Sequence, residues 1–274
     1  MSHRPTLPPT GGLAITAIAA IIAPSHAVSA SPPAPTLSIS TAYEGSLLIK
    51  LLDMRMRNHV AGQRFSNDVH VESSGAVSFI RRFDINAASV GSFDHGRPVP
   101  AAYVQHSLEG RKRSSRTLVW RAPSAVMDPL TQGLRLTATP LGSAPCPGVM
   151  PTSDGKQRYD LVLNYVGRGA LAPEQQGMGL TQPIQCRLDF RPVSGFKVNS
   201  QQGLRQFLRG DIRATFAKAP AAGVWVATDI GADTLVGRLH LRLTSLAIQG
   251  SRAAFETPAA SKPQTQPPRK THRK

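Results

Sequence analysis

Apolar and polar residues alternate with a period of two along much of the chain between residues 43 and 255. The alternation is clearest in segment 239–243, where three leucines are separated by His240 and Arg242. Segments 159–165 and 184–190 follow the same rule, which is typical of strands with one buried and one solvated face. The second half of the chain is therefore predicted to be β-rich.

Gly-containing turns join several of these strands into expected hairpins. Segments 64–73 and 76–85 predict one hairpin, and segments 100–110 and 114–122 predict another, closed by a basic turn. Segment 43–57 is compatible with either strand or helix.

Two short helices are expected among the strands. Asp128 is a good N-cap and Pro129 suits the first helical position, so one helix begins there. An apolar stripe in segment 201–212 indicates a second helix. Because the strands follow one another through hairpin turns, the predicted fold is all-β with antiparallel pairing: a curved sheet or half-barrel, with a sandwich as the alternative.

The N-terminal segment has the order of a secretory signal peptide: Arg4, an apolar run of 11 residues at 13–23, then small residues suited to cleavage. The run is too short to span a bilayer, and the alternative is a short buried helix. We therefore predict a signal peptide at 1–30, a Pro/Ser linker at 31–42, one exported β-rich domain at 43–255 and a disordered basic tail at 256–274. No later segment reaches transmembrane length, so the expected location is the periplasm.

Export changes how the two cysteines are interpreted. In an oxidising compartment Cys146 and Cys186 most simply form a disulfide that closes a loop of about 40 residues and stabilises the fold by about 4 kcal/mol. The alternative is two separate buried thiols in a reducing compartment. Neither C-x-x-C nor a nearby pair of histidines indicates a metal site.

The chain is strongly basic, with 32 Lys and Arg against 16 Asp and Glu, a formal charge of +16. Such a charge favours anionic partners, here anionic lipid or lipopolysaccharide, unless the cations are simply solvated. The densest group of cations lies in one predicted turn and consists of Arg111, Lys112, Arg113 and Arg116. This turn is either an anion-binding site or a solvated loop. Nucleic acid is not an expected partner, because the chain is exported and no aromatic stacking platform accompanies the cations.

No catalytic motif is present in the sequence. The segment around Ser194 lacks the first glycine of a nucleophile elbow, no phosphate-binding loop occurs, and the histidines are widely separated. We expect no cofactor and no metal. The leading hypothesis is a non-catalytic protein that binds an apolar or anionic lipid-like ligand or an envelope protein; the alternatives are a structural interaction module and an envelope hydrolase.

Three blocks, 146–165, 183–196 and 223–241, resemble alphaproteobacterial members of the exported domain-of-unknown-function 3108 family. The resemblance covers Tyr43 to Phe255 and departs from the family pattern at Gly237, where a proline is expected. It implies a periplasmic all-β protein with a curved antiparallel sheet, similar in outline to lipoprotein-carrier half-barrels, and it supplies no catalytic residue. The motif residues to which it gives structural roles are Asp128, Pro129, Asp154, Gly155, Arg158, Tyr159, Asp160, Pro192, Gly195 and Trp225.

Overall fold

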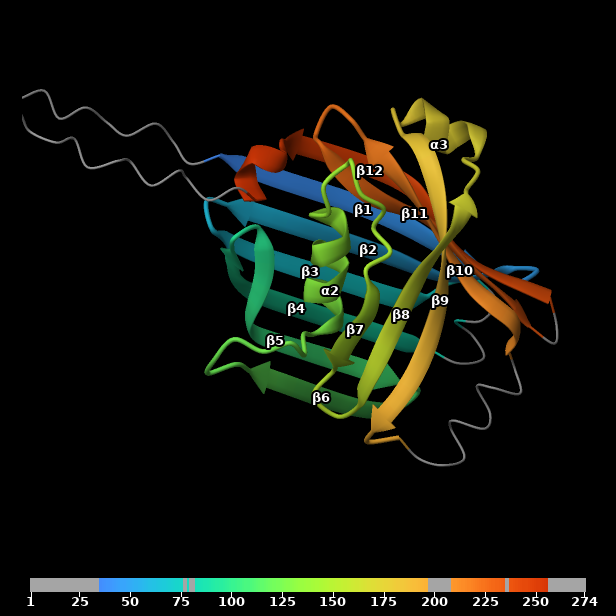
Figure 1. The fold of residues 1–274 in the computed structure, drawn as a ribbon. Coiled ribbons are helices and arrows are strands. Elements are labelled where there is room, and N and C mark those ends of the chain that lie inside the picture. The colour runs from blue at the N-terminus through green and yellow to red at the C-terminus, as the bar shows by residue number, and fades with distance from the viewer. Residues whose placement is uncertain (1–34, 76–77, 79–81, 197–207, 235–236, 256–274) are drawn as a thin grey trace, which may run out of the picture. The chain divides into compact units, whose positions relative to one another are not determined.

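A computed structural model describes residues 35–75, 78, 82–196, 208–234 and 237–255, and within them twelve strands form one sheet (Figure 1). The first six strands are β1 (Thr36–Ser46), β2 (Lys50–Ala61), β3 (Arg64–Ser73), β4 (Phe83–Asp94), β5 (Arg97–Glu109) and β6 (Lys112–Val119). The other six are β7 (Gly148–Ser153), β8 (Arg158–Arg168), β9 (Thr181–Ser194), β10 (Leu208–Ala219), β11 (Val224–Thr234) and β12 (Gly237–Gly250). The helices are α2 (Pro129–Thr137), α3 (Pro173–Gly177) and the 3₁₀ helix η1 (Arg252–Phe255).

The sheet is antiparallel throughout and consists of two meanders. Strands β1 to β6 lie side by side in chain order, and so do β7 to β12. The two meanders are joined where β1 pairs with β12, so that Leu37 faces Gly250 and Ser46 faces His240. Strands β6 and β7 are left at the two edges of the sheet.

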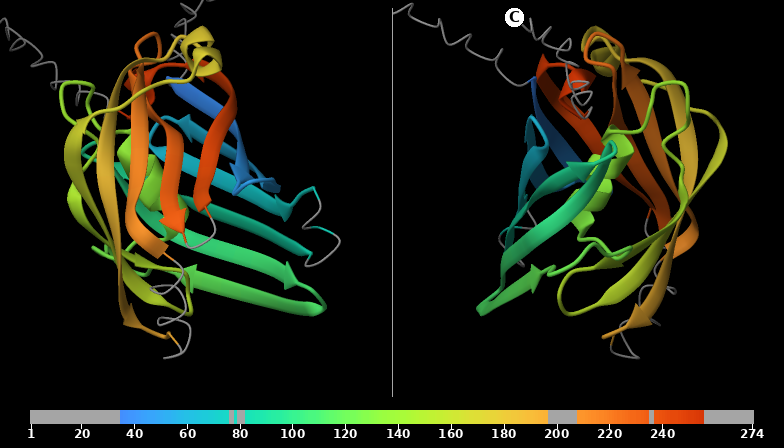
Figure 2. Two further views of the ribbon diagram at one scale, coloured as in Figure 1. Left: turned by 90° about the vertical axis from the view of Figure 1, so that its right-hand side faces the viewer. Right: turned by 60° about the vertical axis from the view of Figure 1, so that its left-hand side comes forward.

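The sheet curls around helix α2, which lies on its concave side (Figures 1 and 2). Asp128 caps α2 as predicted: its side chain accepts hydrogen bonds from the backbone N–H groups of Leu130 and Thr131. Leu130 packs against Ala87 and Tyr103 of β4 and β5, while Leu134 joins the main core. The helix therefore fills one part of the space that the curved sheet encloses.

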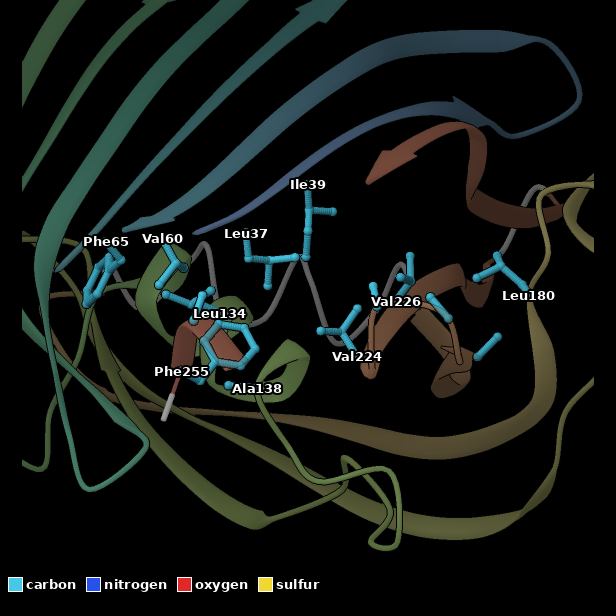
Figure 3. Close-up of a cluster of buried hydrophobic side chains, with 14 of the residues drawn as sticks. Leu37, Ile39, Val60, Phe65, Leu134, Ala138, Leu180, Val224, Val226 and Phe255 are labelled. Carbon is cyan, nitrogen blue, oxygen red and sulfur yellow. The ribbon is translucent and has the colours of Figure 1, made fainter. Parts of the chain in front are cut away.

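The main core lies at one end of the concave face, where β1 turns alternate side chains inward. Leu37, Ile39 and Tyr43 are buried. They belong to a cluster that includes Leu134 of α2 and Phe255 of η1 (Figure 3). The C-terminal turn thus closes over the same core that the first strand begins.

The fold class is confirmed: the described chain is all-β with short helices, and the hairpin predicted at 100–122 appears as β5–β6. The hairpin predicted from 64–73 and 76–85 appears as β3–β4, but its second strand begins at Phe83 and not at residue 76. The boundary of the linker at 31–42 was wrong, because β1 begins at Thr36 and its alternating residues are already buried in the core. The signal peptide at 1–30 and the tail at 256–274 lie outside the described residues.

The second predicted helix was also wrong in its described part. Residues 201–207 lie outside the described residues, but β10 begins at Leu208 and pairs with β9 and β11, so the segment continues as a strand. Helix α3 was not expected from the sequence. No helix among the described residues is long and apolar enough to cross a membrane.

Candidate functional site

An apolar cavity of about 440 Å³ lies on the concave face, beside the part that α2 fills. Val71 of β3 lines it, and Val69, two residues earlier on the same face, packs against Leu130 of α2. The helix and the cavity therefore share one side of the sheet. The cavity is lined by Gly45, Leu52, Met54, Val71, Leu161, Leu188, Phe190, Ile212, Ile230, Gly231, Ala232, Leu239, His240 and Leu241.

Strand register explains why these residues meet. Residues that face each other across an antiparallel pair point to the same side of the sheet. Gly45 of β1 faces Leu52 of β2 on one side and Leu241 of β12 on the other. The chain of partners continues through Leu241–Ile230, Ala232–Ile212, Ile212–Leu188 and Phe190–Leu161. Residues from β1–β3 and β8–β12 thus form one continuous apolar lining.

One residue of the lining is ionisable, and its side chain points away from the cavity. His240 stands between the inward-facing Leu239 and Leu241, and its Nδ1 lies 3.2 Å from an Asp229 carboxylate oxygen on the convex face. His240 therefore contributes backbone, not its ring, to the cavity. At Gly45 an added Cβ would collide with the Leu52 side chain, so glycine keeps that part of the lining open.

A buried polar junction anchors α2 to the sheet. Asp128 is fully buried; besides the two N–H groups of the cap, it accepts hydrogen bonds from Ser89 Oγ of β4 at 3.0 Å and Thr131 Oγ1 at 2.6 Å. Burial raises the pKa of the Asp128 carboxyl, against the opposing effect of these donors. Three of these bonds cap the helix from within, and the bond from Ser89 ties it to β4, so the role of Asp128 is structural.

The sheet edges are held together by an ion pair. Arg116 of β6 donates from Nη1 to Asp154 in the β7–β8 turn, and both side chains are mostly buried. Asp154 also accepts from the backbone N–H groups of Lys156 and Gln157, at 2.9 and 2.7 Å, which shapes the turn. Gly155 adopts φ of 86°, a conformation that glycine allows without strain.

The four cations predicted as one anion site are not brought together. Arg116 is engaged with Asp154. Lys112 lines a cavity of about 480 Å³ with Arg116 and Lys156, whereas Arg113 lines a different one with Asp84 and His106. Period-two alternation on β6 separates them, and Arg111 is an exposed residue of the turn. The four cations therefore do not line one cavity, and binding of an anion by them stays a prediction.

The predicted disulfide is present between Cys146 and Cys186, with Cα atoms 6.0 Å apart. Cys186 is fully buried in β9, beside Met150 and Trp225. The bond therefore ties the segment that precedes edge strand β7 to the interior of the second meander.

The remaining motif residues lie in the second meander and have structural surroundings. Tyr159 packs against Phe190 with tilted rings whose centroids are 4.8 Å apart, and it faces Pro192 across the β8–β9 pair; burial raises the pKa of Tyr159 to about 12. Trp225 is buried and donates from Nε1 to the Pro140 carbonyl at 3.3 Å.

Three further motif residues belong to the same β8–β9 hairpin. Arg158 faces Ser194, and Asp160 faces Arg191. Gly195 has φ of 80°, and an added Cβ would collide with the Lys156 carbonyl. None of the motif residues lines the apolar cavity.

Comparison with known proteins assigns the chain to no family. No family model matches the chain, and no curated protein matches it. One similar solved structure is a beta-barrel-like protein of domain of unknown function DUF1849 from Brucella abortus, at 12% identity over 80% of this chain and 100% of that chain, with a TM-score of 0.39. This similarity is too low to carry an argument, and membership of the domain-of-unknown-function 3108 family stays a prediction.

The cavity itself was missed by sequence reasoning at the level of residues. Alternation identified inward-facing positions such as Leu161, Leu239 and Leu241, but not which of them remain uncovered by the helix. Within the described ranges, no group of three or more His, Cys, Asp and Glu side chains is placed to hold a metal ion.

Proposed function

We propose that the protein is a non-catalytic binding protein that holds an apolar, lipid-like molecule in the concave cavity. The observation that carries the proposal is the composition of the lining: aliphatic and aromatic side chains from seven strands and Gly45 of an eighth, with the His240 ring turned outward. Cavities of this size and character are typical of sites for small molecules, and transfer of hydrocarbon from water contributes about 0.8 kcal/mol per CH₂.

Export to the periplasm belongs to the same proposal. It is supported by the order of the first 30 residues and by the disulfide, which persists in oxidising compartments. A binding protein in such a compartment would shield its ligand from water between the sites where the ligand is made and used.

The first test is extraction of the purified protein with organic solvent, followed by mass spectrometry of the extract. The second is titration with the neutral fluorescent probe 1-N-phenylnaphthylamine, whose emission rises in apolar surroundings. We expect a copurifying lipid-like molecule, or saturable probe binding after its removal. A protein that yields no extractable molecule and does not bind the probe contradicts the proposal.

A matched pair of variants locates the binding. Val71→Trp places a large ring in the cavity and is expected to abolish probe binding. His70→Trp adds the same ring to the opposite face of the same strand and should leave binding unchanged. Circular dichroism melting of both variants verifies that each remains folded, and equal probe binding by the two would refute the location.

A further inference from the structure

Several hairpin turns of the antiparallel sheet lie at the end where the cavity is found. We call this end the cavity rim; its turns described in full are the β1–β2 turn (47–49), the β5–β6 turn (110–111) and the β7–β8 turn (154–157). The β1–β2 turn connects Gly45 to Leu52, both of which line the cavity. Figure 2 shows the β5–β6 hairpin projecting at this end of the sheet.

The tip of the β1–β2 hairpin is apolar and exposed. Leu48 is 88% exposed and Ile49 53% exposed. Leu48 also has φ of 98°, a left-handed conformation that a leucine adopts only at a cost in free energy. The turn is held by a backbone hydrogen bond from Leu47 N to Ile49 O at 3.0 Å. A leucine that is both exposed to solvent and strained in its backbone does not stabilise the fold. This favours a role for Leu48 in contact with another molecule.

Cations occupy the other described turns of the rim. Arg111, Lys112 and Arg113 are exposed at the tip of β5–β6, and Lys156 lies in the β7–β8 turn, beside Lys112 in one cavity. Asp154 in that turn is already paired with Arg116. The rim therefore combines an apolar tip with a cationic border.

We propose that the cavity rim docks on a lipid bilayer that contains anionic lipids. Leu48 and Ile49 enter the hydrocarbon edge of the leaflet, and the cations of the β5–β6 and β7–β8 turns lie against lipid phosphates. Docking in this orientation places the apolar cavity next to the membrane. The inference rests on the rim and not on an occupied cavity, so it stands apart from the proposed ligand.

The other large hydrophobic residues that are exposed, Val90, Val119, Val149, Tyr165, Val166 and Val193, do not combine exposure with a left-handed backbone, as Leu48 does. Val119 is 68% exposed, at the opposite end of β6, but it is a single residue in ordinary strand conformation. Scattered apolar residues of this kind are normal on protein surfaces. Val119 is therefore a suitable control.

Flotation with vesicles tests the apolar tip. The full chain is mixed with vesicles of phosphatidylcholine containing 30% phosphatidylglycerol, so that any contribution of residues 1–34 and 256–274 is common to all variants. Leu48→Gly combined with Ile49→Ser is expected to weaken binding at least about tenfold, the loss for two apolar side chains that no longer enter the leaflet. Glycine relieves the positive φ, so the melting temperature should not fall. Val119→Ser should bind like the unaltered chain.

A second pair of variants tests the cations. Replacement of Arg111, Lys112 and Arg113 by Gln is expected to reduce binding to these vesicles by about 100-fold, since each cation near an anionic surface contributes about fivefold. The matched triple variant replaces Arg64, Arg97 and Arg121, exposed at the opposite end, with Gln and should retain binding. Undiminished binding by either rim variant, or an equal loss in its control, overturns the inference. Val71→Trp, which fills the cavity, should bind vesicles like the unaltered chain. Loss of ligand binding and loss of membrane docking can therefore be told apart.

Discussion

Loss of the disulfide should destabilise the second meander in a measurable way. The bond joins the segment before edge strand β7 to the fully buried Cys186 of β9, across a sequence separation of 40 residues. In the sheet, β7 has a strand neighbour on one side only, β8. On its other side it has, among the described residues, only an isolated parallel bridge between Met127 and Thr152, so the covalent bond adds to the few contacts that hold this edge.

The chain-entropy relation for a closed loop of this length gives a loss of about 13 cal/mol/K in the unfolded state, or about 4 kcal/mol at 25 °C. With an m value of about 2 kcal/mol/M, the urea midpoint should fall by about 2 M when the bond is absent. Urea unfolding followed by circular dichroism measures this directly for the oxidised chain, for the chain in dithiothreitol, and for Cys146→Ala/Cys186→Ala.

The reduced chain is the cleaner comparison, because it keeps both sulfur atoms in the core. The double alanine variant also leaves a small void at Cys186 and should be less stable than the reduced chain by about 1 kcal/mol. A midpoint that moves by less than 0.5 M on reduction would refute the reasoning, since the loop restraint would then contribute little to the free energy of unfolding.

Three further predictions concern buried polar groups. Asp128→Ala should lower the free energy of unfolding by about 2–4 kcal/mol, because Ser89, Thr131 and the backbone N–H groups of the α2 cap lose their acceptor. Asp128→Asn should lower it by less. Urea unfolding measures both losses, and equal losses would contradict the role of the acceptor. Burial raises the pKa of Tyr43 from 10.0 to about 12, so its contribution to stability is complete below pH 10 and is lost as pH rises from 10 through 12. Between pH 10 and 11 the unaltered chain should therefore lose about 1 kcal/mol more than Tyr43→Phe in urea unfolding, and parallel pH profiles would contradict this. Arg116→Met should leave Asp154 unpaired between the sheet edges and lower the melting temperature, whereas Arg113→Met should not; equal melting temperatures would contradict a role for the ion pair.

Local patterns predicted the local structure well. Alternation identified β8, β9 and β12 of the second meander, glycine turns identified two hairpins, and the Asp128–Pro129 pair identified the start of α2, because each depends on residues close in sequence. The prediction of a helix in segment 201–212 was wrong from Leu208 onward, because apolar residues in a short segment fit both the helical period of 3.6 and the strand period of 2. Pairing of β10 with β9 and β11 favours the strand there.

Features that depend on distant residues could not be predicted. The pairing of β1 with β12 joins residues that are about as far apart in sequence as the described chain allows. The sequence of neither strand indicates which strand it pairs with. The cavity depends on where α2 stops covering the curved sheet. The four basic residues near the β5–β6 turn were grouped by sequence proximity, although alternation on a strand sends Lys112 and Arg113 to opposite faces.

The pairing of β1 with β12 has a consequence for the order in which the strands could be connected. Along the sheet, the strands follow the order β7 to β12 and then β1 to β6. This is an up-and-down meander in which the chain begins at a strand in the middle of the sheet. A circular permutant that links the end of η1 to β1 and opens the chain between β6 and α2 would make every neighbouring pair of strands consecutive. Since contacts between distant segments slow folding, such a permutant should reach the same architecture faster than the natural order.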